Sequence, residues 1–196
     1  MNKELDIDSA LGIRTSGRVD SHADVHHHPY EATPYEVLDR IIDGGYIDGN
    51  DILADMGCGK GRVSIYLSLR TGCKSIGIEY NKELYETAID NLHYSGVKNV
   101  SFVYLDAAKY KITDETSFFF FNPFADNIFR SVLNNIIMSY YENPREMKLF
   151  FYYPDDSYLA ILRNTDELSF VADIDCGTDT DRREYVAVYK IEILKD

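Results

Sequence analysis

Apolar and polar positions alternate along the chain in blocks that predict strands separated by helices. Short apolar runs predict strands, and longer stretches with an apolar residue every three or four positions predict helices. The predicted strands occupy residues 51–56, 74–80, 99–105, 116–121, 148–153, 168–175 and 184–194. The predicted helices occupy residues 34–43, 62–70, 81–94, 126–141 and 156–163. Residues 1–29 are polar without a sustained period and predict an irregular arm or lid, with room for a short helix.

This order of elements predicts an α/β fold. Strands that alternate with helices form mostly parallel sheets, because each helix carries the chain back across a face of the sheet. The short polar spacer at residues 176–183 predicts that the last two strands pair as an antiparallel hairpin. We therefore expect a doubly wound, mostly parallel seven-stranded sheet with one antiparallel strand, helices on both faces and an N-terminal arm.

Two helix starts carry recognisable signals. Thr33, Pro34 and Glu36 predict a capping box with proline at the first helical position. Asn81 is predicted to cap the helix that places Leu84 on its apolar face.

Composition and charge limit the class of protein. The chain has 196 residues, of which 45% are hydrophobic, and this predicts one domain with its own core. No apolar stretch is long enough to span a bilayer, and residues 1–20 lack the apolar core of a signal peptide, so we expect a cytoplasmic protein with no membrane partner. The formal net charge of -13 disfavours nucleic acid as a partner, since a phosphate backbone is normally met by clustered Lys and Arg.

Metal and disulfide chemistry receive little support from the sequence. The three cysteines, Cys58, Cys73 and Cys176, form no C-x-x-C pair, so neither a zinc site nor a disulfide framework is predicted. Residues 26–28 are adjacent histidines with His22 one helical turn before them. Adjacent histidines do not all face one ion, so we expect no metal site.

A glycine-rich loop between a predicted strand and helix is the most informative stretch. Asp55, Gly57, Cys58, Gly59 and Gly61 form a D-x-G-x-G-x-G spacing. A dinucleotide site would place a third glycine where Arg62 stands. The spacing instead resembles the first motif of class I S-adenosylmethionine-dependent methyltransferases. A purely structural turn is the alternative interpretation of the loop.

The resemblance, which covers roughly residues 30–155, implies S-adenosylmethionine as the cofactor and a Rossmann-like domain at residues 34–196, preceded by an arm or lid at residues 1–33. Glu79, beside Tyr80, stands where the family binds the ribose. Asp106 resembles the acid that holds the adenine amine, with Ala107 near the ring. Each acid has a simpler alternative, a solvated strand-end group for Glu79 and a helix cap for Asp106.

A segment before the core resembles the part of related methyltransferases that folds over the cofactor. Tyr30 and Thr33 belong to this segment, which is similarly placed in the histone-lysine methyltransferases that lack a SET domain. The alternatives are core packing for Tyr30 and the capping box for Thr33.

The candidate catalytic residues follow the fourth predicted strand. Asn122, Pro123 and Phe124 resemble the Asn/Asp-Pro-Pro-aromatic motif of amino-methyltransferases, in which the Asn and a proline carbonyl orient the target nitrogen. The second proline of that motif is missing here. The alternative is a strand-ending turn in which Asn122 caps the backbone.

Together these features predict a methyltransferase that acts on a small-molecule or protein acceptor, with nitrogen favoured over oxygen. The alternatives are a nucleic-acid methyltransferase and a non-catalytic module that binds S-adenosylmethionine. A nicotinamide oxidoreductase is disfavoured by Arg62. The sequence indicates neither the acceptor nor the oligomeric state.

Overall fold

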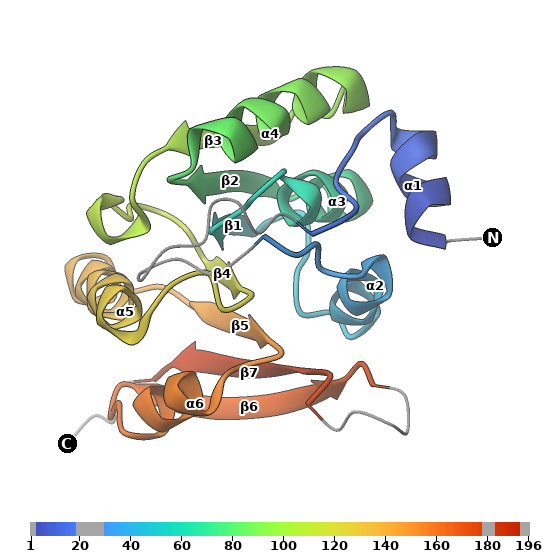
Figure 1. The fold of residues 1–196 in the computed structure, drawn as a ribbon. Coiled ribbons are helices and arrows are strands. Elements are labelled where there is room, and N and C mark those ends of the chain that lie inside the picture. The colour runs from blue at the N-terminus through green and yellow to red at the C-terminus, as the bar shows by residue number, and fades with distance from the viewer. Residues whose placement is uncertain (1–2, 19–29, 178–182, 193–196) are drawn as a thin grey trace.

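A seven-stranded sheet forms the centre of the computed structural model, which describes residues 3–18, 30–177 and 183–192. The strands lie in the order β3-β2-β1-β4-β5-β7-β6 (Figure 1). Their bounds are β1 Ile52–Met56, β2 Lys74–Glu79, β3 Val100–Tyr104, β4 Ser117–Phe120, β5 Lys148–Tyr152, β6 Leu168–Asp175 and β7 Tyr185–Ile191. The helices are α1 Lys3–Leu11, α2 Tyr35–Asp43, α3 Arg62–Thr71, α4 Lys82–Ser95, α5 Asp126–Glu142 and α6 Asp156–Arg163, with a 3-10 turn, η1, at Ala107–Lys109.

The strand directions confirm the predicted architecture. Strands β1 to β5 pair in parallel, whereas β7 runs antiparallel to both β5 and β6. The chain winds from β1 outward through β2 to β3, then returns to β4 on the other side of β1. The carboxyl ends of β1 and β4 therefore flank the point where the winding reverses, and such a point opens a crevice above the sheet.

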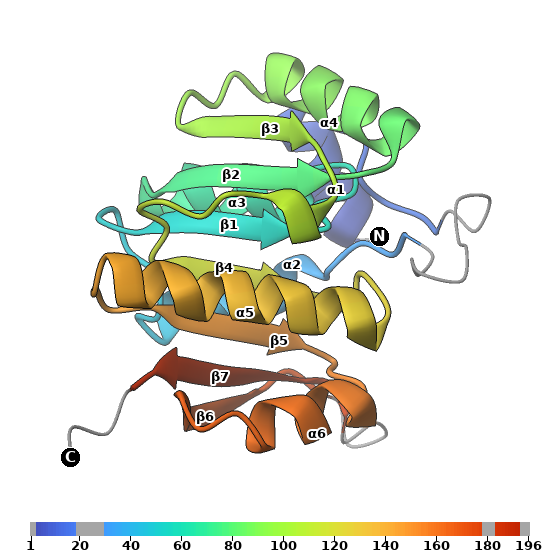
Figure 2. The same ribbon diagram turned by 90° about the vertical axis from the view of Figure 1, so that its left-hand side faces the viewer.

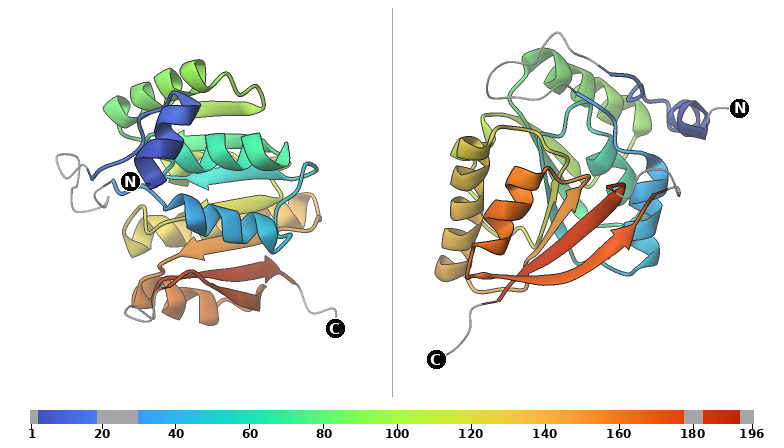
Figure 3. Two further views of the ribbon diagram at one scale, coloured as in Figure 1. Left: turned by 90° about the vertical axis from the view of Figure 1, so that its right-hand side faces the viewer. Right: turned by 60° about the horizontal axis from the view of Figure 1, so that its bottom comes forward.

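Helices cover both faces of the sheet. Helices α5 and α6 lie in front of the sheet in Figure 2, and α2 and α3 lie in front of the opposite face in the left view of Figure 3. Helix α4 joins the α3 layer, since Ala88 of α4 packs with Ile65 of α3 and Phe102 of β3.

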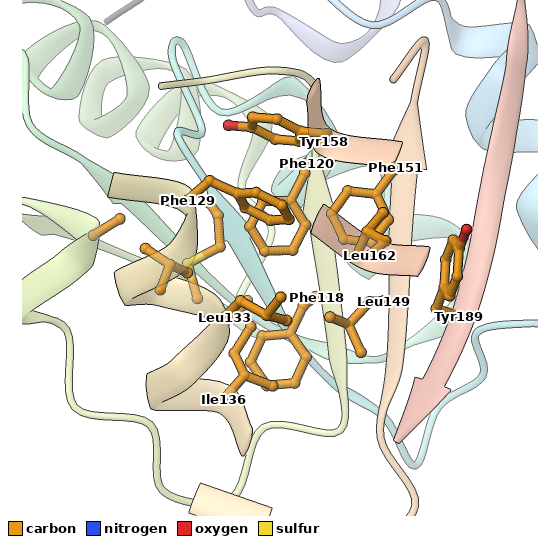
Figure 4. Packing of buried hydrophobic residues seen from close by; sticks show 14 of the residues in the cluster. Phe118, Phe120, Phe129, Leu133, Ile136, Leu149, Phe151, Tyr158, Leu162 and Tyr189 are labelled. Atoms are coloured by element: carbon orange, nitrogen blue, oxygen red, sulfur yellow. The ribbon is translucent and has the colours of Figure 1, made fainter. Parts of the chain in front are cut away.

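The phenylalanine run of β4 serves both faces because successive side chains of a strand point to opposite sides. Phe118 and Phe120 pack in the cluster under α5 and α6, and Phe119 packs in the cluster under α2 and α3. The ring of Phe120 stacks on that of Phe151 with 4.8 Å between centroids (Figure 4). This packing holds the end of β4 in place and thereby positions the loop that follows it.

The predicted capping box before α2 is wrong. The N-cap is Pro34, with ψ of 140°, whose side chain makes no capping bond, and the free N–H of Tyr35 donates to Oε1 of Glu4 in α1 at 3.1 Å. The carbonyl oxygen of Pro34 accepts the N–H groups of Val37 and Leu38 instead. Thr33 therefore lies one residue outside the cap, where its backbone carbonyl accepts a hydrogen bond from Arg62. The predicted Asn81 cap of α4 is confirmed, since its Oδ1 accepts the N–H groups of Glu83 and Leu84.

Two short elements lie outside the predicted set of helices. Helix α1 stands where the sequence allowed a short helix in the arm, and η1 follows β3 directly. No helix in residues 3–18, 30–177 or 183–192 is long and apolar enough to cross a membrane. The histidines of residues 22 and 26–28 lie outside the described residues.

Candidate functional site

A cleft opens at the carboxyl ends of β1, β2, β3 and β4, at the reversal point of the winding. Most of the site residues predicted from the sequence line it: Tyr30, Thr33, Asp55, Gly57, Cys58, Gly59, Glu79, Tyr80, Asp106, Ala107, Pro123 and Phe124. Gly61 and Asn122 are not among the lining residues. The structure thus brings residues from five separate segments of the sequence to one cavity.

The glycine loop is shaped to leave its backbone exposed to the cleft. Gly57, Gly59 and Gly61 all have positive φ, a conformation that costs glycine little. A Cβ on Gly57 would lie 2.4 Å from a carbon of Pro123, and one on Gly59 would lie 2.3 Å from the Tyr30 ring. The absence of a side chain at these two positions therefore lets the loop pass directly beneath Pro123 and Tyr30 in the cleft wall.

Gly61 has a different role from the two glycines before it. It is the N-cap of α3, and a Cβ there would lie 2.4 Å from the ring of Phe102 in the core. The glycine therefore allows α3 to pack close to the sheet, and its role in cofactor binding stays a prediction.

Glu79 is tightly held at the end of β2. Its two carboxylate oxygens accept hydrogen bonds from the backbone N–H groups of Gly59 and Asn81, each at 2.8 Å. The residue is only 5% exposed, so it is not the solvated acid that the sequence left open. The carboxylate links the glycine loop to the start of α4 at the wall of the cleft.

Asp55 is a second buried acid beneath the loop. Its Oδ2 accepts a hydrogen bond from the Ser64 hydroxyl at 2.8 Å. Burial raises the pKa of Asp55 to about 7, with the Ser64 hydrogen bond acting against this rise and the charge of Glu79 adding to it. The group therefore changes charge close to neutral pH.

Asp106 is the helix cap that the sequence offered as one of two alternatives. Its Oδ1 accepts the N–H group of Ala108 and caps η1, and its Oδ2 lies 3.8 Å from the ammonium of Lys109. The residue also lines the cleft beside Ala107. Capping fixes the side chain at the cleft edge.

Tyr30 and Thr33 close the cleft from the side of the N-terminal segment. The Tyr30 hydroxyl donates to the carbonyl oxygen of Thr15 at 2.6 Å, and its ring covers Gly59. Burial raises the pKa of Tyr30, so the phenol keeps its proton. Both residues reach the cleft although neither belongs to a helix or long strand.

The predicted catalytic motif divides into separate roles. The Nδ2 of Asn122 donates to the carbonyl oxygen of Tyr153 at 2.6 Å, and its Oδ1 accepts the N–H of Asp155 at 3.2 Å. Asn122 and Tyr153 are the two non-glycine residues with positive φ in the described part of the chain. This geometry favours the strand-ending turn, in which Asn122 ties the loop after β4 to the loop after β5.

The other two residues of the motif face the cleft. Pro123 packs close to Gly57. Phe124 is a buried residue whose ring packs edge-on against that of Phe120, with 6.4 Å between centroids. The carbonyl oxygen of Phe124 accepts the hydroxyl of Tyr158 at 2.6 Å. Phe124 is therefore a core residue as well as part of the cleft wall.

Sequence reasoning missed several of the lining residues, and Glu31, Arg62 and Phe121 matter most among them for the chemistry of the cleft. Arg62 stood out only as the residue that breaks a dinucleotide motif, because its partners lie far away along the chain. Glu31 and Phe121 adjoin predicted site residues, and this proximity was the one available signal.

Comparisons with known proteins agree with this geometry. A family model described as a methyltransferase domain matches residues 53–145. A protein-lysine N-methyltransferase of Saccharolobus islandicus (strain REY15A) is 35% identical over 74 residues, which are 37% of this chain and 46% of that protein. A histone-lysine N-methyltransferase of Dictyostelium discoideum, specific for lysine 79 of histone H3, is 41% identical over 56 residues, which are 29% of this chain and 3% of that protein. The matches thus span about half of the first relative and a small part of the second.

Solved structures share the fold at low sequence identity. The crystal structure of an RNA methyltransferase from Salinibacter ruber in complex with S-adenosyl-L-homocysteine aligns with a TM-score of 0.59 and 23% identity, and covers 84% of this chain and 97% of that one. The strand order, the glycine loop and the family match point the same way. The chain has the Rossmann-like fold of the class I S-adenosylmethionine-dependent methyltransferases, and a methyltransferase-domain model matches its residues 53–145.

Proposed function

We propose that the protein methylates the side-chain nitrogen of a lysine in a protein acceptor, with S-adenosylmethionine as the methyl donor. The observation that carries the proposal is the composition of the cleft beside the β4 loop. Phe121 and Pro123 provide apolar walls there, and Glu31 adds a carboxylate. A lysine side chain has the matching form, an apolar stem that ends in a cationic amine.

The cofactor side of the cleft fits the donor. Glu79 would accept hydrogen bonds from the ribose hydroxyls, and Asp106 would accept one from the adenine amine. Gly57 and Gly59 let the methionine end approach the backbone closely, since any side chain there would fill that space. Tyr30 would cover this end of the cleft from above Gly59.

When bound, S-adenosylmethionine supplies a methyl group that is already activated by its sulfonium. The protein therefore has to position the acceptor and shield the site, and needs no nucleophile of its own. The β4 loop positions the acceptor nitrogen, and Pro123 sets the distance of this loop from Gly57. Glu31 attracts the ammonium form, which gives its proton to water before reaction.

The acceptor class draws support from charge and from the relatives. A formal charge of -13 attracts a lysine-rich segment and repels a phosphate backbone. Both of the curated relatives described above are named as lysine N-methyltransferases. RNA is the second candidate, favoured by the likeness in fold to an RNA methyltransferase.

A transfer assay with labelled S-adenosylmethionine and cell extract tests the proposal. We expect label in material that protease removes and RNase leaves intact, and acid hydrolysis should release it as methyl-lysine. The matched control is Glu79→Ala, which should bind the cofactor about 30-fold more weakly because a buried, hydrogen-bonded carboxylate is lost. If RNase removes the label instead, the acceptor is RNA, and the proposal of a protein lysine is overturned.

A further inference from the structure

Arg62 is a buried cation at the start of α3, directly after the glycine loop. Its side chain is only 3% exposed. One of its terminal nitrogens pairs with Glu4, and the other lies 3.4 Å from Asp8. Both acids belong to α1, so a helix more than 50 residues earlier in the chain balances the charge of Arg62.

The remaining donors of Arg62 also reach the N-terminal segments. Nε donates to the hydroxyl of Thr15 at 2.7 Å, and the terminal nitrogens donate to the Ser16 hydroxyl at 2.9 Å and the Thr33 carbonyl oxygen at 3.0 Å. The guanidinium lies over the ring of Tyr35, 4.2 Å from its centroid. One side chain thus gathers α1, the turn that follows it and the segment before α2.

Asp8 is the second centre of this network. Its Oδ2 accepts the backbone N–H groups of Thr15 and Ser16, and its Oδ1 accepts the hydroxyls of Thr15 and Tyr35. Desolvation alone would raise the pKa of Asp8, but these hydrogen bonds lower it overall. The carboxylate therefore stays charged opposite Arg62.

Helix α1 depends on these polar contacts for its position. It lies beside α2 and α3, outside the helix layer (Figures 1 and 3), and Asp8 is the one residue within α1 that is buried. Ile7 and Leu11 are only partly buried against the core. Ile13, just after the helix, is 3% exposed in the core and is the main apolar anchor of the segment. Helix α1 itself gains little from the hydrophobic effect, so its ion pairs contribute strongly to how firmly it docks.

The same network leads directly to the cleft. The Thr15 carbonyl oxygen holds the hydroxyl of Tyr30, whose ring covers Gly59, and the Thr33 carbonyl oxygen binds Arg62 itself. If residues 3–18 move away, Tyr30 loses its hydrogen-bond acceptor and Arg62 loses its counter-charges. A bound cofactor would contact Tyr30 and Thr33 only while this segment is docked.

We propose that Arg62 is a positioning residue that docks residues 3–18 against the glycine loop, so that cofactor binding and docking of this segment strengthen each other. The inference rests on the cofactor side of the proposed function and is independent of which acceptor is methylated. Linkage then requires that each event favours the other by the same factor.

Hydrogen exchange of the intact wild-type protein tests the first half of this linkage. The backbone amide of Arg14 donates to Oδ1 of Asn91 in α4 at 2.8 Å, and that of Tyr35 donates to Oε1 of Glu4 at 3.1 Å, so both amides report docking of the segment. S-adenosylhomocysteine at saturating concentration should slow their exchange by about fivefold or more, as expected when a ligand stabilises a local structure. Unchanged exchange in residues 3–18 with the ligand bound overturns the proposal.

Calorimetry on variants tests the second half. Asp8→Asn should weaken S-adenosylhomocysteine binding by about tenfold or more and reduce the ligand-induced rise in Tm. The matched control is Asp39→Asn, which breaks the Arg70–Asp39–Tyr66 cluster, a set of the same residue types that does not line the cleft. The control should lower stability but keep the Kd within about twofold of wild type.

The outcomes separate this inference from the proposed function. A folded Asp8→Asn protein with wild-type affinity overturns the role of the network. Should that variant not fold, Glu4→Gln at the more exposed end of the network replaces it, with the same expected direction. Normal binding and coupling without methylation of protein would overturn lysine as the acceptor and leave the role of Arg62 standing. Absence of any S-adenosylhomocysteine binding by the wild type would overturn both.

Discussion

Asp55 connects the charge of the cleft to cofactor affinity. Its pKa is raised to about 7 chiefly by burial, so the free protein carries a protonated carboxyl below that pH and a carboxylate above it. S-adenosylmethionine carries a sulfonium and an ammonium group, and a nearby carboxylate is stabilised by positive charge. We therefore expect cofactor binding to lower the pKa of Asp55 and to release its proton.

We predict that cofactor affinity decreases as the pH is lowered below about 7. At low pH Asp55 is protonated, and it must lose this proton before its carboxylate can attract the cations of the cofactor. Calorimetry should show a Kd that rises up to about tenfold per unit between about pH 7 and pH 5.5, and that is nearly constant from about pH 7 to pH 7.5. Asp55→Asn, which mimics the protonated form, should bind weakly at every pH. An equally steep profile in that variant would assign the titration to another group.

Asn122 acts on the neighbouring loop in this geometry. Its amide spans from the end of β4 to Tyr153 and Asp155 after β5, and both Asn122 and Tyr153 have positive φ. Such backbone conformations persist only where surrounding contacts hold them, and they cluster at functional sites. We therefore interpret Asn122 as a residue that positions the acceptor side of the cleft through the loop after β5.

The corresponding variant is Asn122→Ala. It should lower the free energy of unfolding by about 1–2 kcal/mol, because two hydrogen bonds to backbone are lost. Its Kd for S-adenosylhomocysteine should match that of the wild type, and KM for the acceptor should rise more than kcat falls. A fall in kcat of about a hundredfold with unchanged stability would instead restore Asn122 to direct contact with the acceptor nitrogen.

Site residues differ in how visible they are in the sequence. Glu79 could be located because a strand-end acid has a fixed place relative to the glycine loop. Arg62 could not be assigned its role, since its partners Glu4, Thr15 and Thr33 lie 58, 47 and 29 residues away along the chain. A local pattern contains no information about which distant polar groups will meet a buried charge.

The loop between β1 and α3 shows how one element contains two kinds of glycine. Gly59 has Tyr30 of the cleft wall above it, whereas Gly61 has Phe102 of the core beside it. Gly59→Ala should therefore displace Tyr30 and weaken S-adenosylhomocysteine binding at least about tenfold, with a small loss of stability. Gly61→Ala should mainly destabilise the fold, by about 1–3 kcal/mol, because a methyl group must enter packed core.

Denaturation curves and calorimetry on both glycine variants distinguish these roles. The two substitutions add the same methyl group at positive φ, so each is the control for the other. Equal losses of stability and of affinity in both would contradict the division of the loop into a cofactor-facing and a core-facing part.

At the level of helices and strands, periodicity was a good guide and end signals were less reliable. The apolar runs located every strand, since alternation and burial of a strand follow from local residue type. The N-cap of α2 was misplaced because Thr33-Pro34 satisfies the local rule, but the carbonyl of Thr33 is engaged by Arg62. Helix α1 lacks a strong apolar face, so the sequence allowed a helix in the arm without fixing its position.

The whole molecule carries a strong negative net charge, which bears on the choice of acceptor. The formal charge of -13 creates a field that attracts cations from a distance and repels phosphate. Such a field raises the encounter rate with a basic partner but contributes little once the partner is bound. Its effect should therefore be visible in kcat/KM and not in kcat.

Salt provides the test of this field, because ionic strength screens charges separated by more than the Debye length, about 8 Å at 0.15 M. With a lysine-rich peptide as acceptor, kcat/KM should fall roughly tenfold between about 20 mM and about 200 mM salt, as for electrostatically steered association. The Kd for S-adenosylhomocysteine should change much less, since the cofactor binds in a cleft lined by buried groups such as Glu79 and Asp55. A neutral acceptor peptide that keeps a single target lysine is the matched control, and its kcat/KM should be lower at low salt and nearly independent of salt. Equal salt dependence for the two peptides would contradict steering by the acidic surface and leave the apolar walls and Glu31 as the basis of acceptor choice.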